Sequence, residues 1–76
     1  MGVTEDLADA LARDVLAAQD EMEQERFYLD VAKMLATVSP SMEEAFMTSV
    51  RVRLAERRAR DYLNRRLGAH RKGAAG

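Results

Sequence analysis

The chain contains no cysteine and only one histidine, His70, and these two shortages limit its chemistry. Without cysteine it can form neither disulfides nor thiolate metal sites. Because His70 falls in a segment that we expect to be a tail, no serine is expected to have a general base within reach. We therefore expect no catalytic residues, no metal and no cofactor, and we interpret the chain as a non-enzymatic protein.

Residues that favour strands are also scarce. Isoleucine is absent, and no segment alternates apolar and polar residues in the way a half-buried strand does. Thirteen alanines and ten arginines, together with many leucine, glutamate and methionine residues, favour helices instead. The sequence therefore predicts an all-α fold.

Long apolar runs are absent as well. No run approaches the roughly 20 apolar residues of a membrane-spanning helix, and the acidic N-terminal segment does not resemble a signal peptide. We therefore expect no membrane association and a cytoplasmic location. Ten arginines against two lysines, with many alanines, are typical of a GC-rich bacterial genome.

The small size of the chain points to an assembly. A chain of 76 residues buries only about 60% of its unfolded surface when it folds. Small domains usually compensate with disulfides, a metal or oligomerisation, and the first two are not expected here. A homo-oligomer or a protein partner is the remaining option, and no small-molecule substrate is inferred.

The only proline, Pro40, divides the chain into two halves of opposite charge. Ser39 is suited to cap a helix whose first residue is Pro40, and the residue before a proline resists helical geometry. Residues 1–38 carry nine acids and three bases, a net charge of −6, whereas residues 39–76 carry four acids and nine bases, a net charge of +5. We expect a turn over residues 38–41 between two antiparallel helices.

The first half is predicted to be one helix over residues 5–37. Apolar residues recur at steps of three and four from Ala8 to Ala36, which is the pattern of a single apolar stripe. Thr4 is the expected N-cap. The alternative is a break at Gln19–Asp20, because Asp20 and Glu23 fit a capping box. That alternative would add a third, N-terminal helix.

The second half is predicted to be a helix over residues 41–67 that ends before Gly68, followed by a flexible basic tail over residues 68–76. Its apolar residues change sides. The residues on the first face are Met42, Phe46, Met47, Val50 and Leu54. The second face is rotated by well over 100°, more than supercoiling explains, and consists of Val52, Ala55, Ala59, Tyr62 and Leu63. Either the helix bends near residues 51–55 or its two halves pack against different neighbours.

The sequence next to the turn favours self-association. Residues 27–38 carry a second apolar stripe on the side opposite the first, and a single partner helix cannot cover both. The expected architecture is a two-helix antiparallel hairpin, residues 1–67 forming a single domain, that dimerises into a helical bundle. The predicted protein interface consists of Phe27, Tyr28, Val31, Met34, Leu35, Phe46, Met47 and Val50.

Three functional interpretations follow from these patterns. The leading one is a protein–protein interaction, adaptor or regulatory protein that acts as a homodimer or docked on a larger protein. The second is a small nucleic-acid-binding regulator with an arginine face, although in an antiparallel hairpin the acidic half would neutralise that face. The third is an accessory subunit or assembly factor of a larger complex. The predicted nucleic-acid face consists of Arg53, Arg57, Arg58, Arg60 and Arg65.

Overall fold

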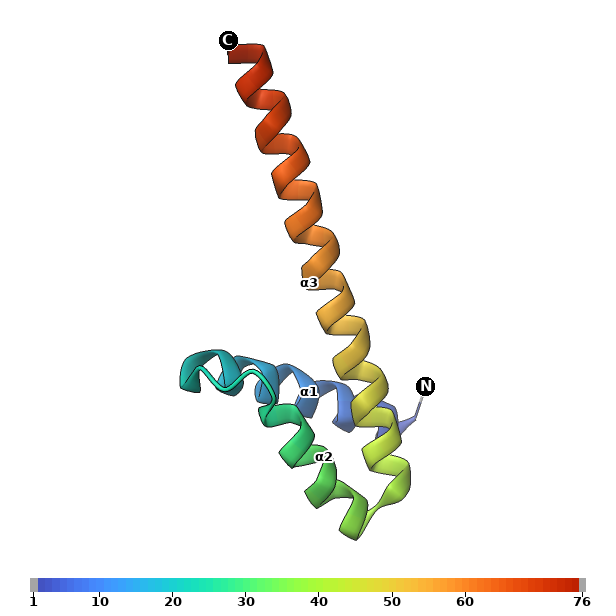
Figure 1. Ribbon diagram of the computed structural model, residues 1–76. Helices are drawn as coiled ribbons and strands as arrows, with labels where there is room; N and C mark the ends of the chain where they lie inside the picture. Colours follow the sequence, from blue (N-terminus) through green and yellow to red (C-terminus); the bar gives the residue numbers. More distant parts are fainter. Residues whose placement is uncertain (1, 76) are drawn as a thin grey trace.

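The regular structure of the described residues is entirely α-helical, which confirms the predicted all-α class. The computed structural model describes the backbone of residues 2–75 and the side chains of residues 2–73. Over these residues the helices are α1 (Val3–Met22), α2 (Phe27–Val38) and α3 (Pro40–Ala75), and there is no strand (Figure 1). None of the helices within residues 2–75 is long and apolar enough to cross a bilayer.

The prediction of one continuous helix over residues 5–37 is wrong. The chain has the additional N-terminal helix that was the alternative, but the break lies at residues 23–26 and not at Gln19–Asp20. Glu23 adopts the left-handed conformation, with φ 56° and ψ 40°. Its N–H bonds Asp20 O at 3.3 Å, and the N–H of Gln24 bonds Gln19 O at 3.0 Å. These are the two hydrogen bonds of a Schellman motif, and they end α1 without a glycine.

The side chain of Gln19 connects α1 to the start of α2. It is buried, and its Oε1 accepts a hydrogen bond from the backbone N–H of Tyr28 at 3.1 Å. That N–H is one of the first in α2, which have no partner inside their own helix. Arg26, at the N-cap of α2, makes no capping hydrogen bond through its side chain. Gln19 therefore supplies a cap from another helix and fixes how α2 leaves the turn.

Ser39 forms the boundary between α2 and α3, as the sequence predicts. Its backbone is extended, and its Oγ accepts a hydrogen bond from the N–H of Met42 at 3.1 Å. Proline at the first position of α3 costs no hydrogen bond, since that N–H would have had no partner. With only Ser39 between them, α2 and α3 form a V (Figure 1).

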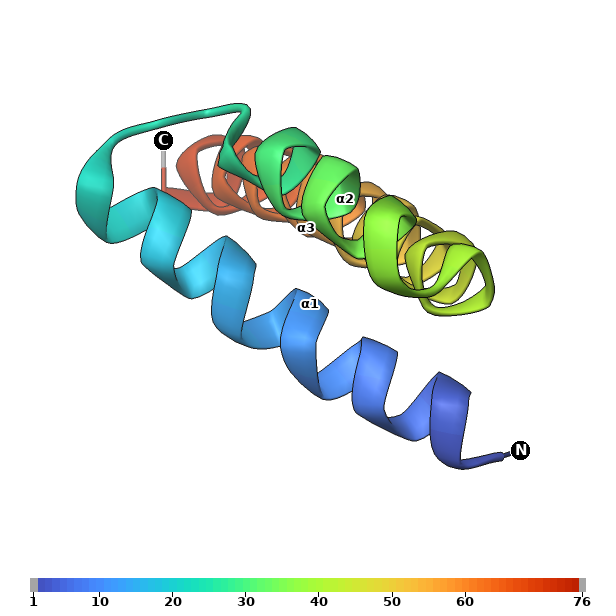
Figure 2. The ribbon, with the colours of Figure 1, turned by 90° about the horizontal axis from the view of Figure 1, so that it is seen from below.

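Helix α1 lies across one face of the V as a second layer (Figure 2). The core forms where the three helices meet, and its largest fully buried side chains are Phe46, Leu16 and Val50. Alanines of α1 and α2 allow the helices to approach closely. The buried apolar residues are Ala8, Ala12, Val15, Leu16, Ala32, Leu35, Phe46 and Val50.

Helix α3 is much longer than the other two. The prediction that it ends at Leu67 is wrong, because Gly68 lies inside the helix and has a negative φ. Glycine inside a helix costs roughly 0.5–1 kcal/mol relative to alanine but does not end it. The molecule measures 57 × 30 × 13 Å, and its long dimension comes from the C-terminal half of α3, which extends beyond α1 and α2 (Figure 1).

The first prediction concerns Phe46, which is 0% exposed. Phe46→Ala removes most of the largest core side chain and should lower the free energy of unfolding by about 3–5 kcal/mol. Phe46→Leu should cost less than about 2 kcal/mol. Urea unfolding followed by circular dichroism measures both. Leu7→Ala is the matched control: Leu7 is 58% exposed, so its loss should change stability by about 0.5 kcal/mol or less. Equal losses at positions 46 and 7 would contradict this core.

Candidate interaction surfaces

The predicted protein interface lies largely inside the chain's own core. Leu35, Phe46 and Val50 are buried, so they present no surface to a partner. Phe27, Tyr28, Val31 and Met47 are half-buried and pack against the core. Met34 is 61% exposed. The second side of α2 receives part of its cover within the same chain, because the break after Met22 brings α1 close to it, but Met34 and Val38 stay exposed.

A groove of about 1010 Å³ runs along the other face of the V, between α2 and α3. Its apolar lining residues are Phe27, Leu29, Ala32, Ala36 and Met47. Acidic side chains outnumber basic ones around them. The charged lining residues are Glu23, Glu25, Asp30 and Glu43 against Arg26, Lys33 and Arg51.

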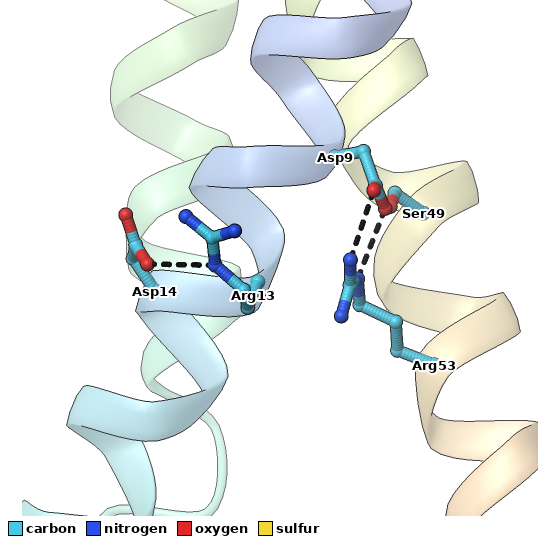
Figure 3. A network of polar contacts seen from close by, with 5 residues as sticks. All are labelled: Asp9, Arg13, Asp14, Ser49 and Arg53. Atoms are coloured by element: carbon cyan, nitrogen blue, oxygen red, sulfur yellow. Dashed lines mark hydrogen bonds and ion pairs between the residues drawn. The ribbon is translucent and has the colours of Figure 1, made fainter.

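A polar cluster ties α1 to α3 (Figure 3). Arg53 donates two hydrogen bonds to the carboxylate of Asp9, from Nε to Oδ1 at 3.0 Å and from Nη2 to Oδ2 at 2.9 Å. Ser49 Oγ also donates to Asp9 Oδ1. The bonds from Arg53 and Ser49 stabilise the charged carboxylate and lower the pKa of Asp9 to about 2. The same bond to Asp9 raises the pKa of Arg53.

The acidic helix neutralises only the beginning of the arginine face. Besides Arg53, Arg57 pairs with Asp20 of α1, with 3.0 Å between Nη2 and Oδ2. Arg60 pairs with Glu56 of its own helix at 2.7 Å. Arg58 and Arg65 form no ion pair with any side chain of residues 2–73.

The ion pairs expected for an antiparallel hairpin are therefore not formed. An antiparallel hairpin about Ser39 would place Asp20 and Glu21 near Arg60 and Arg58, and Asp14 near Arg65. Asp14 instead contacts its neighbour Arg13 at 3.1 Å. The reason is geometric: α1 crosses α3 near residues 49–57 and does not run alongside its whole length.

The part of α3 beyond this crossing, residues 58–73, is called the arm here. One face of α3 leading into and along it is apolar: Val52, Tyr62 and Leu63 are 64%, 57% and 54% exposed, and Ala55 and Ala59 are exposed as well. We call these five residues the outer stripe. At 3.6 residues per turn, they lie on the side of α3 opposite the buried Phe46 and Val50. The change of apolar face does not interrupt the helix, because α3 is one continuous helix from Pro40 to Ala75. Its second apolar face has no neighbour among the described residues of this chain.

The charge of the molecule is divided between a body, residues 2–50, and the segment of residues 51–73 that ends in the arm. Residues 2–50 carry eleven acids and three bases, a net charge of −8. Residues 51–73 carry two acids and nine bases, a net charge of +7. The arm is about 24 Å long at 1.5 Å per residue, which is several times the screening length of about 8 Å at physiological salt. Most of the arm is thus electrostatically independent of the acidic body.

No cluster of metal-binding side chains is present within residues 2–73. No group of three or more His, Cys, Asp or Glu side chains there lies close enough to hold a metal ion. Comparison with protein-family models, with curated proteins and with solved structures gives no match. The surfaces of this chain are therefore what indicates a function.

The second prediction concerns acid stability. The folded pKa of Asp9, about 2, lies below its ordinary value of 3.8, so the unfolded chain takes up this proton first as the pH falls. The Asp9–Arg53 pair should stabilise the fold fully above pH 3.8, and this stabilisation should disappear as the pH falls from 3.8 to about 2. The difference in unfolding free energy between the wild type and Asp9→Asn, measured with urea, should shrink over that interval.

Asp14→Asn is the control, because the Asp14–Arg13 pair lies within one helix and is exposed. Such pairs contribute little, about 0–1 kcal/mol. A difference between wild type and Asp9→Asn that stays constant down to pH 2 would contradict the role of this carboxylate.

Proposed function

We propose that this protein is a non-enzymatic helical interaction protein, acting as a homodimer or docked on a larger protein through its outer stripe. The observation that carries this proposal is the exposure of Val52, Tyr62 and Leu63 on a helix that extends past its own body. These side chains recur on one face, so they form a continuous surface and not scattered exposed residues.

The lack of packing along the arm supports the same conclusion. Helices in proteins are stabilised mostly by packing an apolar face. The arm receives no such packing from α1 or α2, although its residues have high helix propensity. A partner helix or groove on the outer stripe would supply the missing packing.

The third prediction tests this use of the outer stripe. The double variant Tyr62→Asp, Leu63→Asp should lose association while its free energy of unfolding as a monomer stays within about 0.5 kcal/mol of the wild type. Sedimentation of the purified chain detects a dimer, and co-purification from its own cells detects a larger partner.

Leu7→Asp is the matched control, since Leu7 is 58% exposed on α1, far from the stripe. It should leave association unchanged. If the double variant and the wild type sediment identically and retain the same co-purifying proteins, the outer stripe is not an interaction surface.

Nucleic-acid binding is the second candidate, and one observation favours it. The arginines that α1 neutralises are Arg53 and Arg57, whereas Arg58 and Arg65 are exposed and form no ion pair within residues 2–73. Unpaired arginines on a projecting helix are suited to phosphate contacts. The acidic body opposes this function, because it repels a polyanion wherever the two approach within the screening length.

The fourth prediction separates the two candidates. If the arm binds duplex DNA, affinity should fall steeply with salt, and Arg58→Ala with Arg65→Ala should reduce the slope of log K against log salt by about 2. Fluorescence anisotropy with a labelled duplex measures this slope. Arg13→Ala on α1 is the control and should leave the slope unchanged. Absence of binding at about 50 mM salt would remove this candidate.

A further inference from the structure

The division of charge suggests what the arm binds. A molecule with a charge of −8 over residues 2–50 and of +7 over residues 51–73, of which the arm carries +5, is strongly dipolar. Two such molecules attract each other when they lie antiparallel, with each arm beside the other's body. Direct pairing of two arms is unfavourable, because residues 58–73 carry six bases and one acid and would place +5 against +5.

The groove between α2 and α3 has the features that the arm requires. It is open on the face of the V that α1 does not cover, and its apolar residues include Phe27, Leu29 and Met47. Its charged lining residues carry a net charge of −1, because four acids, among them Glu25, Asp30 and Glu43, stand against three bases. A helix placed there would complete a four-helix body, with α1 on one face of the V and the new helix on the other.

The arm presents bases on the appropriate side. Arg51 lines the groove in its own chain, and Arg58, Arg65 and Lys72 follow it at intervals of seven residues, on nearly the same side of α3. This basic row lies next to the outer stripe. The two together give a helix face that is apolar from Val52 to Leu63, with Arg66 over the ring of Tyr62, and basic at one edge. This face matches a groove with apolar residues and acidic neighbours.

We propose that the partner is a second copy of this chain, with the arm of each copy lying in the α2–α3 groove of the other. This inference rests on the proposed function and names its partner. The contact is reciprocal, so it closes into a two-fold dimer and leaves no free arm to propagate a filament.

The size of the contact is sufficient for a weak dimer. The arm would bury about half of its circumference in the groove. For a helix about 10 Å wide, over the roughly 18 Å that α2 spans, this buried surface is about 280 Å². Each copy contributes one arm and one groove, so the dimer buries about 1,100 Å² in total, just above the roughly 1,000 Å² that specific interfaces need. With opposite charges across the contact, the dimer should be sensitive to salt.

The fifth prediction exchanges charges between the two surfaces. The arm variant carries Arg58→Glu, Arg65→Glu and Lys72→Glu, and the groove variant carries Glu25→Lys, Asp30→Lys and Glu43→Lys. Each variant alone should raise the dimer dissociation constant about 30-fold or more, since three attractive pairs become repulsive in each of two contacts. An equimolar mixture should form a heterodimer, because both arm–groove contacts are then between opposite charges. Sedimentation equilibrium at low and high salt measures all three samples.

The control is Asp6→Lys, Asp14→Lys and Glu21→Lys, which changes the charge of the body equally but on α1, away from the groove. It should weaken the dimer clearly less than the groove variant does. Circular dichroism confirms that each variant is folded before it is compared.

The outcomes separate this inference from the proposed function. A heterodimer from two monomeric variants establishes the reciprocal contact. A mixture that stays monomeric, or a control that weakens the dimer as much as the groove variant, overturns it. A wild type that is monomeric at every salt concentration also overturns it, and the proposed function then stands only if Tyr62→Asp, Leu63→Asp loses a different protein partner. Binding of duplex DNA by a monomeric wild type would assign the arm to nucleic acid.

Discussion

The fold depends on the reversal of the chain after α1. Phe46 and Val50 are fully buried only because α1 lies across them, and α1 can lie there only if the chain turns between Met22 and Phe27. The left-handed Glu23 makes the turn, and the buried Gln19 fixes its far side by accepting a hydrogen bond from Tyr28. Had the helix continued, α1 would have extended away from α3 and the core would have lost the side chains of Ala8, Ala12, Val15 and Leu16.

The parts of the fold that could be predicted are those encoded by neighbouring residues. The helical composition and the Ser39–Pro40 boundary depend on propensity and on one local cap, and both appear in the structure. The reversal had no such signal, since the left-handed position usually carries glycine or asparagine and here carries glutamate. The apolar stripe did not indicate the break, because its steps of three and four residues recur on both sides of the turn. Conversely, Gly68 looked like a helix end, but glycine is tolerated inside helices at modest cost.

The surfaces were harder to predict than the helices, for the same reason. Residues 27–38 do require cover on a second side, but whether a partner or the chain itself provides it depends on where the chain reverses. In the Asp9–Ser49–Arg53 cluster, Asp9 is separated from its two partners by 40 and 44 positions in the sequence, so no local pattern predicts the cluster. The outer stripe was visible as a change of apolar face, yet only the structure shows that this face has no neighbour within the chain.

A mismatch of helix lengths produces the surface on which function depends. Helix α3 has 36 residues, α2 has 12, and α1 has 20 but crosses α3 at an angle. Neutralisation by α1 therefore ends at Arg57, and apolar packing ends near Leu54, which leaves an arm with its own charge and its own apolar face. Because the arm is longer than the screening length, the acidic body does not cancel its charge. The groove and the arm are opposite in net charge and similar in length. The arm of a second copy can therefore cover the groove that the first copy leaves open.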